Sequence, residues 1–231
     1  MSSSFTNIKQ SHVFFDDSPG LKKYYEDWAS RYDVDLADQK WVAPRVAANL
    51  VHLLASAYVT PDTTVFDAGC GTGLVGSVLR TLGNYVIDGV DLSENMAAEA
   101  LKTQAYRKAY GGVDLSVPRR DERLDQYGIV VSSGVFTLGH MRPTALLTLI
   151  EYALPGGLIA VSTRGSYAAE TGFEDFARSE KVAALASLEF KLGDARYIAE
   201  ESADYWVFRK TGPAQWQGPR TADPVRNHPS L

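Results

Sequence analysis

Five residues in the first half of the chain have the types and spacing of a ligand-binding turn. Asp67, Gly69, Gly71 and Gly73 lie close together, and Asp91 follows 18 positions after Gly73. Glycine permits positive φ angles and a close approach of the backbone to a ligand. An acid at the end of the next strand accepts hydrogen bonds from ribose hydroxyls. The spacing therefore predicts a site for a ribose-bearing cofactor at the carboxyl ends of parallel strands.

Two classes of cofactor fit this spacing. The segment 71–76 satisfies the G-x-G-x-x-G pattern, in which a helix N-terminus holds the pyrophosphate of a dinucleotide. In that case Asp67 would face an anion at short range, which is unfavourable. S-adenosylmethionine has no phosphate and carries a sulfonium cation and an ammonium group, which suit an acid. Asp67 therefore favours S-adenosylmethionine, with a nicotinamide dinucleotide or a tight turn without a ligand as alternatives.

The elements that position these residues alternate between helix and strand. Apolar spacing and turn residues predict helices over 21–35, 44–57, 73–82, 94 to about 110, 143–153 and 173–188. Strands are expected at 65–67, 85–91, 113–115, 127–133 and 158–163, with turns at 61–64 and 155–157 and a closing hairpin from 190–199 and 204–210. Ser93 is expected to cap the helix that begins at Glu94. This alternation predicts an α/β protein with a Rossmann-like doubly wound sheet.

The composition predicts one domain with polar ends. Residues 1–20 are expected to form a mobile arm, 21–211 the domain, and 212–231 a flexible tail that contains four prolines. The net charge of −5 and the lack of an uninterrupted basic cluster argue against a nucleic-acid partner. Cys70 is the single cysteine, so we expect a small side chain packed under the glycine turn, with no disulfide and no metal site. Without an apolar span or a secretory signal, the expected location is cytoplasmic and away from membranes.

Two segments around the turn resemble a known class. The sequence D-A-G-C-G-T-G at 67–73 is similar to the first motif of class I S-adenosylmethionine-dependent methyltransferases, and G-V-D-L-S-E-N-M at 89–96 to their second. Upstream, Y-E-D-W-A-S-R-Y-D at 25–33 and A-P-R at 43–45 resemble the Williams–Beuren syndrome region methyltransferase-like family. The resemblance covers roughly residues 20–210. It implies a mostly parallel sheet with an antiparallel C-terminal strand and an N-terminal helical lid.

The resemblance also implies roles for individual residues. The implied cofactor site comprises Tyr25, Trp28 and Tyr32 as the lid, Asp67, Gly69, Gly71 and Gly73 at the methionine end, Asp91 at the ribose, Leu92, Met96, Asp114 and Leu115 around the adenine, and Ser133 after the fourth strand. The three aromatic residues of the lid also fall on one helical face, so packing against the domain is the structural alternative.

The acceptor side of the predicted site carries few chemical groups. His140, in the segment after the fourth strand, is a candidate general base because its ordinary pKa lies near neutrality. A histidine that only caps a loop is the alternative. Arg142, Arg164 and Tyr167 are candidates for contact with an acidic or polar substrate, or are ordinary surface residues. No N-P-P-Y-type segment follows the fourth strand, which lowers the expectation of amino-methylation of DNA bases or glutamine.

These observations predict a methyltransferase that acts on the oxygen or nitrogen of a small molecule, in a biosynthetic or similar role. Displacement at a methyl group needs mainly alignment and exclusion of water, so the lack of an obvious catalytic pair is compatible with it. Two alternatives stay open. The bound sulfonium can support an elimination or cyclisation without methyl transfer, or the chain can be a non-catalytic partner of another enzyme. The sequence makes no prediction of the oligomeric state.

Overall fold

The structure is a computed structural model, and it describes residues 10, 11, 13, 14, 17–55, 63–117, 121–199 and 201–212. Most of the predicted N-terminal arm and C-terminal tail lies outside these residues. Among the described residues, no helix is long and apolar enough to cross a membrane.

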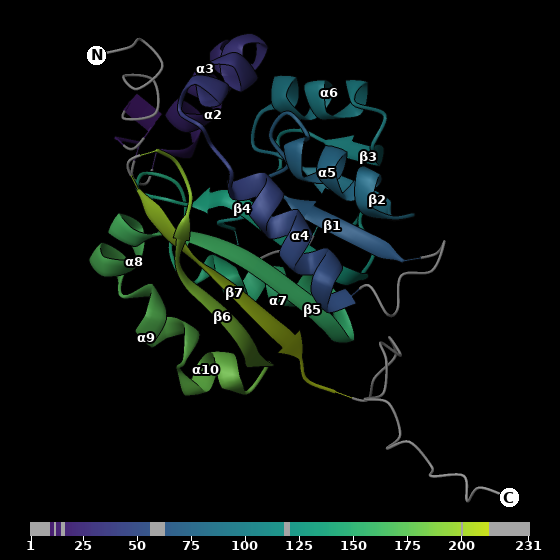
Figure 1. The fold of residues 1–231 in the computed structure, drawn as a ribbon, viewed down its shortest axis with the longest axis vertical. Coiled ribbons are helices and arrows are strands. Elements are labelled where there is room, and N and C mark those ends of the chain that lie inside the picture. Colours follow the sequence, from purple (N-terminus) through teal and green to yellow (C-terminus); the bar gives the residue numbers. More distant parts are fainter. Residues whose placement is uncertain are drawn as a thin grey trace, which may run out of the picture.

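Seven strands form one sheet in the order β3-β2-β1-β4-β5-β7-β6. All neighbours from β3 to β5 are parallel, whereas β7 runs antiparallel to both β5 and β6 (Figure 1). The strands are β1 (Thr64–Ala68), β2 (Val86–Val90), β3 (Tyr106–Tyr110), β4 (Tyr127–Phe136), β5 (Ala153–Arg164), β6 (Ala186–Arg196) and β7 (Ser202–Lys210). The predicted doubly wound fold with an antiparallel C-terminal strand is confirmed.

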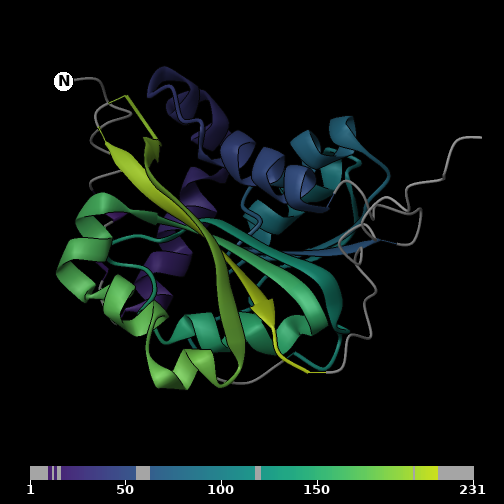
Figure 2. The same ribbon diagram turned by 60° about the horizontal axis from the view of Figure 1, so that its bottom comes forward.

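Helices cover both faces of the sheet, and each face has its own apolar core. The helices are α2 (Ser18–Trp28), a 3₁₀ turn η1 (Ala29–Arg31), α3 (Tyr32–Asp38), α4 (Ala43–Ala55), α5 (Leu74–Leu82), α6 (Glu94–Lys102), α7 (Ala145–Tyr152), α8 (Gly165–Thr171), α9 (Phe173–Ala177) and α10 (Glu180–Ala183). The helices α4 and α5 cover one face of the sheet and α7 to α10 the other (Figure 2), and their side chains belong to two separate apolar cores. Neighbouring residues of a strand therefore enter different cores: Val65 packs with α4 and Phe66 with α7, as a parallel sheet buried on both faces requires.

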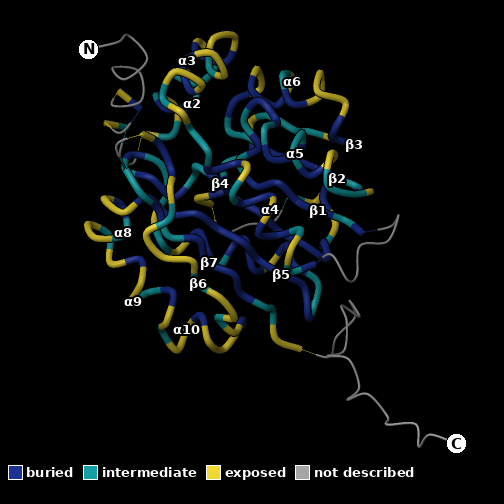
Figure 3. Tube along the Cα trace, viewed as in Figure 1, coloured by how far each residue is buried: buried dark blue, intermediate teal, exposed yellow. Residues whose placement is uncertain are grey.

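The helices α2 and α3 lie beyond the carboxyl ends of the strands and form the predicted lid (Figure 1). The helix α2 starts at Ser18, earlier than the predicted 21, because the Asp17 carboxylate accepts a hydrogen bond from Gly20 N–H at 2.9 Å and Pro19 suits the first turn. The predicted continuous helix over 21–35 is wrong, since the short turn η1 separates α2 from α3. Figure 3 shows exposed residues on the outer surface of the lid and buried ones along the strands.

Four other sequence-based boundaries are wrong. The helix predicted to run to about 110 ends at Lys102, and Gln104 takes a positive φ of 59° before the strand β3. The predicted strand at 113–115 is an irregular segment, although Val113 N–H still donates to the Asp91 carbonyl. The predicted helix 173–188 is two short helices followed by the start of β6. The expected turn at 155–157 lies within β5, where the pairing with β4 changes register and Gly156 has a φ of +81°.

Candidate functional site

A glycine loop joins β1 to α5 and forms the floor of the site. Its backbone bends sharply, with φ angles of +79°, +53° and +92° at Gly69, Gly71 and Gly73. A Cβ atom added at Gly71 would meet no atom within 4 Å, whereas one at Gly73 would lie 2.9 Å from the Ala100 Cα and from the Tyr106 ring. Gly71 therefore faces open space, and Gly73 allows α5 to pack closely against α6.

Asp91 lies directly after β2 and faces the loop. Its carboxylate accepts hydrogen bonds from Gly71 N–H and Ser93 N–H, both at 2.9 Å. Burial raises the pKa of Asp91 to about 6, against the opposing effect of these two hydrogen bonds. The ionised carboxylate holds four lone pairs, of which the backbone takes two, so it can accept two further hydroxyl donors. Ser93 also caps α6 as predicted, because its Oγ accepts from Met96 N–H at 3.1 Å.

Asp67 lies beneath the glycine loop instead of on its open side. The side chain is fully buried, and its Oδ2 accepts a 2.6 Å hydrogen bond from the Tyr106 hydroxyl. The same hydroxyl accepts from Gly76 N–H at 3.0 Å, near the start of α5. Burial raises the pKa of Asp67 to about 7, although the Tyr106 hydrogen bond acts in the opposite direction. Asp67 thus contributes a titratable group under the loop, and its predicted contact with the methionine end of a cofactor stays a prediction.

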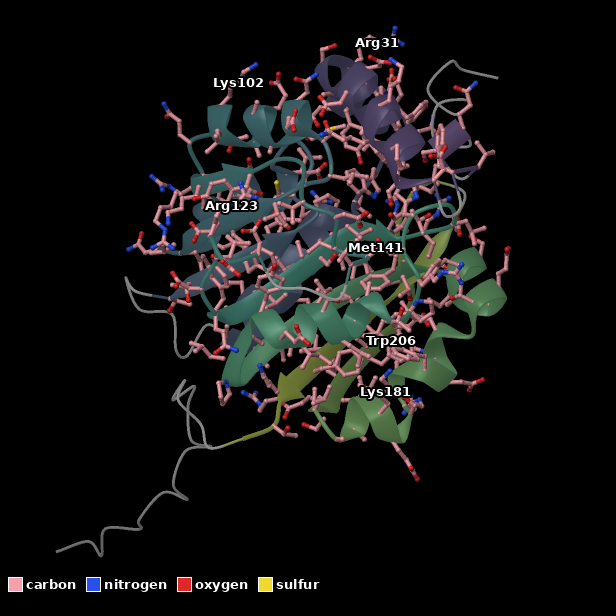
Figure 4. All side chains as sticks on the ribbon, turned by 180° about the vertical axis from the view of Figure 1, so that it is seen from behind. Arg31, Lys102, Arg123, Met141, Lys181 and Trp206 are labelled. Carbon is pink, nitrogen blue, oxygen red and sulfur yellow. The ribbon has the colours of Figure 1, made fainter. Side chains whose placement is uncertain are left out.

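A main cavity of about 710 Å³ opens above the loop, at the carboxyl ends of β1, β2 and β4. Eleven predicted site residues line it: Tyr25, Tyr32, Gly69, Gly71, Asp91, Leu92, Met96, Asp114, Leu115, Ser133 and His140. Met141, which also lines it, lies below the purple lid helices in Figure 4. Three predicted cofactor residues, Trp28, Asp67 and Gly73, do not line this cavity.

A hydrogen bond between Tyr25 and His140 joins the lid to the wall of the main cavity. The His140 Nδ1 lies 2.9 Å from the Leu138 carbonyl, which can only accept, so Nδ1 carries a proton. The Nε2 atom is then free to accept, and it lies 2.6 Å from the Tyr25 hydroxyl. Burial raises the pKa of Tyr25, which keeps its phenol protonated at neutral pH. Tyr25 therefore donates to His140, whose ring is held in one tautomer.

A second fastening joins the lid to α6. The Glu26 carboxylate accepts from Glu94 N–H at 2.6 Å and from Asn95 N–H at 3.0 Å, which are free donors of the first helical turn. Lys22 pairs with the Glu94 side chain at 3.0 Å. Thr72 in the glycine loop also donates to the Asp33 carboxylate of α3. The lid is thus attached to the loops that carry Gly71 and Asp91.

The three predicted substrate residues lie in different places. Arg142 lines a side cavity of about 550 Å³, which shares Ser18 and His140 with the main cavity. Arg164 is buried and paired with Glu201, with 2.7 Å between Nε and Oε2, and it lines a third cavity under the lid. The interpretation of Tyr167 as a substrate contact is wrong, because its fully buried ring packs between Phe136 and Phe173 in the core.

The main cavity has the features that S-adenosylmethionine requires. The space above Gly71 leaves room for a ligand close to the backbone. The Asp91 carboxylate offers acceptors for two ribose hydroxyls, and the side chains of Leu92 and Met96 offer apolar surface for an adenine. The Ser133 Oγ is buried at the cavity wall and has no hydrogen-bond partner among the described residues. A polar group of a ligand in this cavity would satisfy the hydroxyl.

Comparisons with known proteins agree with this geometry. A family model described as a methyltransferase domain matches residues 66–161. Methyltransferase-like protein 27 of Homo sapiens is 31% identical over 147 residues, which is 61% of this chain and 56% of that protein. Malonyl-[acyl-carrier protein] O-methyltransferase of Serratia marcescens is 33% identical over 135 residues, 58% of this chain and 49% of that protein. The chain therefore spans about half the length of these relatives.

Solved structures share the fold at low sequence identity. The magnesium protoporphyrin IX methyltransferase ChlM of Synechocystis PCC 6803, with bound SAM, matches with a TM-score of 0.61 at 18% identity, over 86% of this chain and 99% of that one. A TehB-like SAM-dependent methyltransferase of Corynebacterium glutamicum matches with a TM-score of 0.58 at 20% identity, over 82% and 99% of the two chains.

The fold is that of the class I S-adenosylmethionine-dependent methyltransferases, and residues 66–161 match a methyltransferase domain. The predicted resemblance to that class is confirmed, and the matched domain supports S-adenosylmethionine as the cofactor.

Sequence reasoning missed four residues that shape the site. Glu26 and Tyr106 hold the lid and the glycine loop, and Trp41 and Tyr197 line the third cavity. Tyr106 falls within the helix predicted from 94 to about 110, and Glu26 lies in the segment 25–33 without a predicted role, so neither gave a usable signal. Among the described residues, no group of three or more histidine, cysteine and acidic side chains is arranged to hold a metal ion.

Proposed function

We propose that this protein transfers a methyl group from S-adenosylmethionine to an oxygen or nitrogen atom of a small-molecule acceptor. The proposal is carried by one observation: a single cavity brings together the open side of Gly71, the Asp91 carboxylate and the lid residues Tyr25 and Tyr32. The enclosure suits a small acceptor because the lid helices cover the cavity. Among the relatives, the Serratia marcescens enzyme is by name an O-methyltransferase.

The chain's residues divide the work of binding. The carboxylate of Asp91 holds the ribose hydroxyls, the backbone at Gly71 and the hydroxyl of Ser133 contact the methionine portion, and Leu92 and Met96 enclose the adenine. S-adenosylmethionine supplies a methyl group bound to a positively charged sulfur, which a nucleophile displaces without help from a metal. The lid excludes water, since Tyr25, Tyr32 and the Glu26 fastening cover the cavity.

His140 removes the acceptor's proton in this proposal. Its Nε2 is the unprotonated ring nitrogen, because Nδ1 donates to the Leu138 carbonyl. With S-adenosylmethionine bound, the acceptor oxygen or nitrogen would take the methyl group, the electrons of the broken carbon–sulfur bond would stay on sulfur, and the acceptor's proton would move to the His140 Nε2. Tyr25 occupies Nε2 at 2.6 Å when no acceptor is present. Either the acceptor displaces this hydroxyl or the proton passes through it.

Calorimetric titration with S-adenosylmethionine and S-adenosylhomocysteine tests the binding half of the proposal. We expect micromolar binding of both by the wild type and at least a hundredfold loss in Asp91→Ala, with Asp27→Asn on the exposed face of α2 as the control. Incubation with methyl-labelled S-adenosylmethionine and a mixture of small hydroxy and amino compounds then tests transfer. Failure of the wild type to bind either ligand would refute the cofactor assignment. Turnover of S-adenosylmethionine without label in an acceptor would favour an elimination or cyclisation.

A further inference from the structure

Five aromatic side chains enclose the third cavity, which lies under the lid and is called the aromatic cavity below. They come from separate segments and are Tyr25, Trp28, Tyr32, Trp41 and Tyr197. Their rings contact one another in sequence: Tyr25 stacks on Trp28 with 5.9 Å between ring centroids, and Trp28 meets Tyr32 edge-on at 4.8 Å. The chain of rings continues from Tyr32 to Trp41 at 6.0 Å and from Trp41 to Tyr197 at 6.3 Å. The cavity encloses about 380 Å³.

The aromatic cavity adjoins the main cavity near the end of β4. Tyr25, Tyr32 and Gly134 line both cavities. Gly134 has a φ of +84°, and a Cβ added there would lie 3.1 Å from the Trp41 ring and 3.6 Å from the Tyr197 hydroxyl. The absence of a side chain at Gly134 therefore lets the end of β4 pack closely against the Trp41 ring. A molecule in the aromatic cavity would lie next to the main cavity, because Tyr25, Tyr32 and Gly134 belong to both walls.

The wall of the aromatic cavity carries almost no net charge. Arg164 is the one ionised side chain among the described residues that line it, and Glu201 neutralises its guanidinium. Burial raises the pKa of Tyr197 to about 12 and holds that of Tyr32 well above its ordinary value, so the phenols stay neutral. The other polar side-chain groups are the hydroxyls of Ser11 and Thr137 and the indole N–H groups of Trp28 and Trp41, of which Trp28 donates to Asp35. Among the described residues that line the cavity, there is no carboxylate to attract a cation.

We propose that the aromatic cavity is the acceptor site and takes a flat, uncharged aromatic molecule that bears a hydroxyl group. Ring faces and edges in several orientations suit a planar ring system, which binds by offset or edge-on contact with each wall. The few hydroxyls of the wall orient the polar substituent, as in other apolar ligand sites. This assignment rests on the proposed methyl transfer, and it names the acceptor as an aromatic alcohol, with its hydroxyl directed toward Tyr25 and His140.

Three naphthalene probes of one shape separate the possible ligand classes. Calorimetric titrations at pH 7, with and without saturating S-adenosylhomocysteine, use 2-naphthol, the anion 2-naphthoate and the cation 2-naphthylmethylammonium. We expect 2-naphthol to bind at least tenfold more tightly than either charged probe. Equal or tighter binding of the anion or the cation would overturn the assignment. So would binding of S-adenosylhomocysteine without any binding of 2-naphthol.

Substitutions at Tyr197 locate the probe, because Tyr197 lines the aromatic cavity and not the main cavity. Tyr197→Leu is expected to weaken 2-naphthol at least tenfold and to leave S-adenosylhomocysteine affinity unchanged, while Tyr197→Phe restores most of the binding. Phe190→Leu removes a ring from the exposed strand β6 and is the matched control. If Tyr197→Leu fails to fold, Trp41→Leu serves as a second variant. Unchanged 2-naphthol binding in a folded variant would refute the aromatic cavity as the acceptor site. Failure of the wild type to bind S-adenosylhomocysteine would instead refute the proposed function.

Discussion

The buried carboxyl of Asp67 predicts that the ligand-free protein becomes less stable as the pH rises. The pKa of this group is raised from 3.8 to about 7, chiefly because the side chain is fully buried. A raised pKa in the folded state means that folding favours the protonated form. The resulting stability is fully present below the unfolded pKa and is lost as the pH rises through 7. The full shift in the Asp67 pKa corresponds to about 4 kcal/mol of unfolding free energy.

The part of this stability loss that falls between pH 5 and pH 8 is large enough to measure. Between pH 5 and pH 8, a shift of this size removes about 2.5 kcal/mol of unfolding free energy. Asp67→Asn keeps an acceptor for the Tyr106 hydroxyl and cannot ionise, so it should lack this loss. Asp91 titrates in the same direction in both proteins and therefore contributes little to the difference between them.

Urea unfolding at pH 5, 6, 7 and 8, followed by tryptophan fluorescence, measures the effect. We expect the free energies of wild type and Asp67→Asn to diverge by about 2.5 kcal/mol over this range, with the variant the more stable at pH 8 relative to pH 5. Tyr106→Phe removes a hydrogen bond that lowers the Asp67 pKa, so its transition should move to higher pH. Parallel pH profiles for wild type and Asp67→Asn would refute the reasoning.

Three further predictions concern the cavity and its lid. Because the pKa of Asp91 is about 6, S-adenosylhomocysteine affinity should rise about tenfold from pH 5 to pH 7.5 as the carboxylate ionises, and calorimetry should find no such rise in Asp91→Asn. Gly71→Ala should weaken S-adenosylhomocysteine binding at least tenfold and lower the unfolding free energy by about 1 kcal/mol. Gly73→Ala, whose added methyl group clashes with α6, should lower the free energy of urea unfolding by about 3 kcal/mol. Glu26→Gln should lower the unfolding free energy by about 1 kcal/mol and speed proteolysis within the lid, while the control Asp27→Asn should do neither. Equal behaviour of the two variants would contradict the role of the Glu26 hydrogen bonds to α6 in holding the lid.

The sequence was most informative where one local pattern determined one local structure. The glycine spacing from Gly69 to Gly73 predicted the loop, and the apolar run at 127–133 predicted a central strand. Asp91 was correctly expected at the end of a strand facing that loop, because the doubly wound topology places it there.

The errors arose where contacts between distant segments decide the structure. The segment 106–110 has two cationic residues and reads as the end of a helix, yet it forms β3 because Tyr106 fills a space beside Gly76 and Gly89. The direction of the Asp67 side chain also depends on a distant residue, because it points under the loop toward Tyr106, 39 positions away; its predicted contact with a ligand stays a prediction. The roles of Trp41 and Tyr197 depend on the approach of two loops that lie more than 150 positions apart.

The order of the strands also has a consequence for how the chain folds. β1 is the first strand along the described chain, and it lies inside the sheet between β2 and β4. Val65 can pair with Ile87 of β2 early, but its other side pairs only after Ile129 of β4 has been made. During synthesis, one side of an apolar strand therefore stays open while the sequence from β2 to β3 emerges. Such an open edge is slow to close and prone to pair with other chains. The lid docks on loops that follow β2 and β4. It is synthesised before both loops, and it can dock only after both have been made. Refolding at high concentration should accordingly lose more protein to aggregation than refolding at low concentration, before any S-adenosylmethionine site exists.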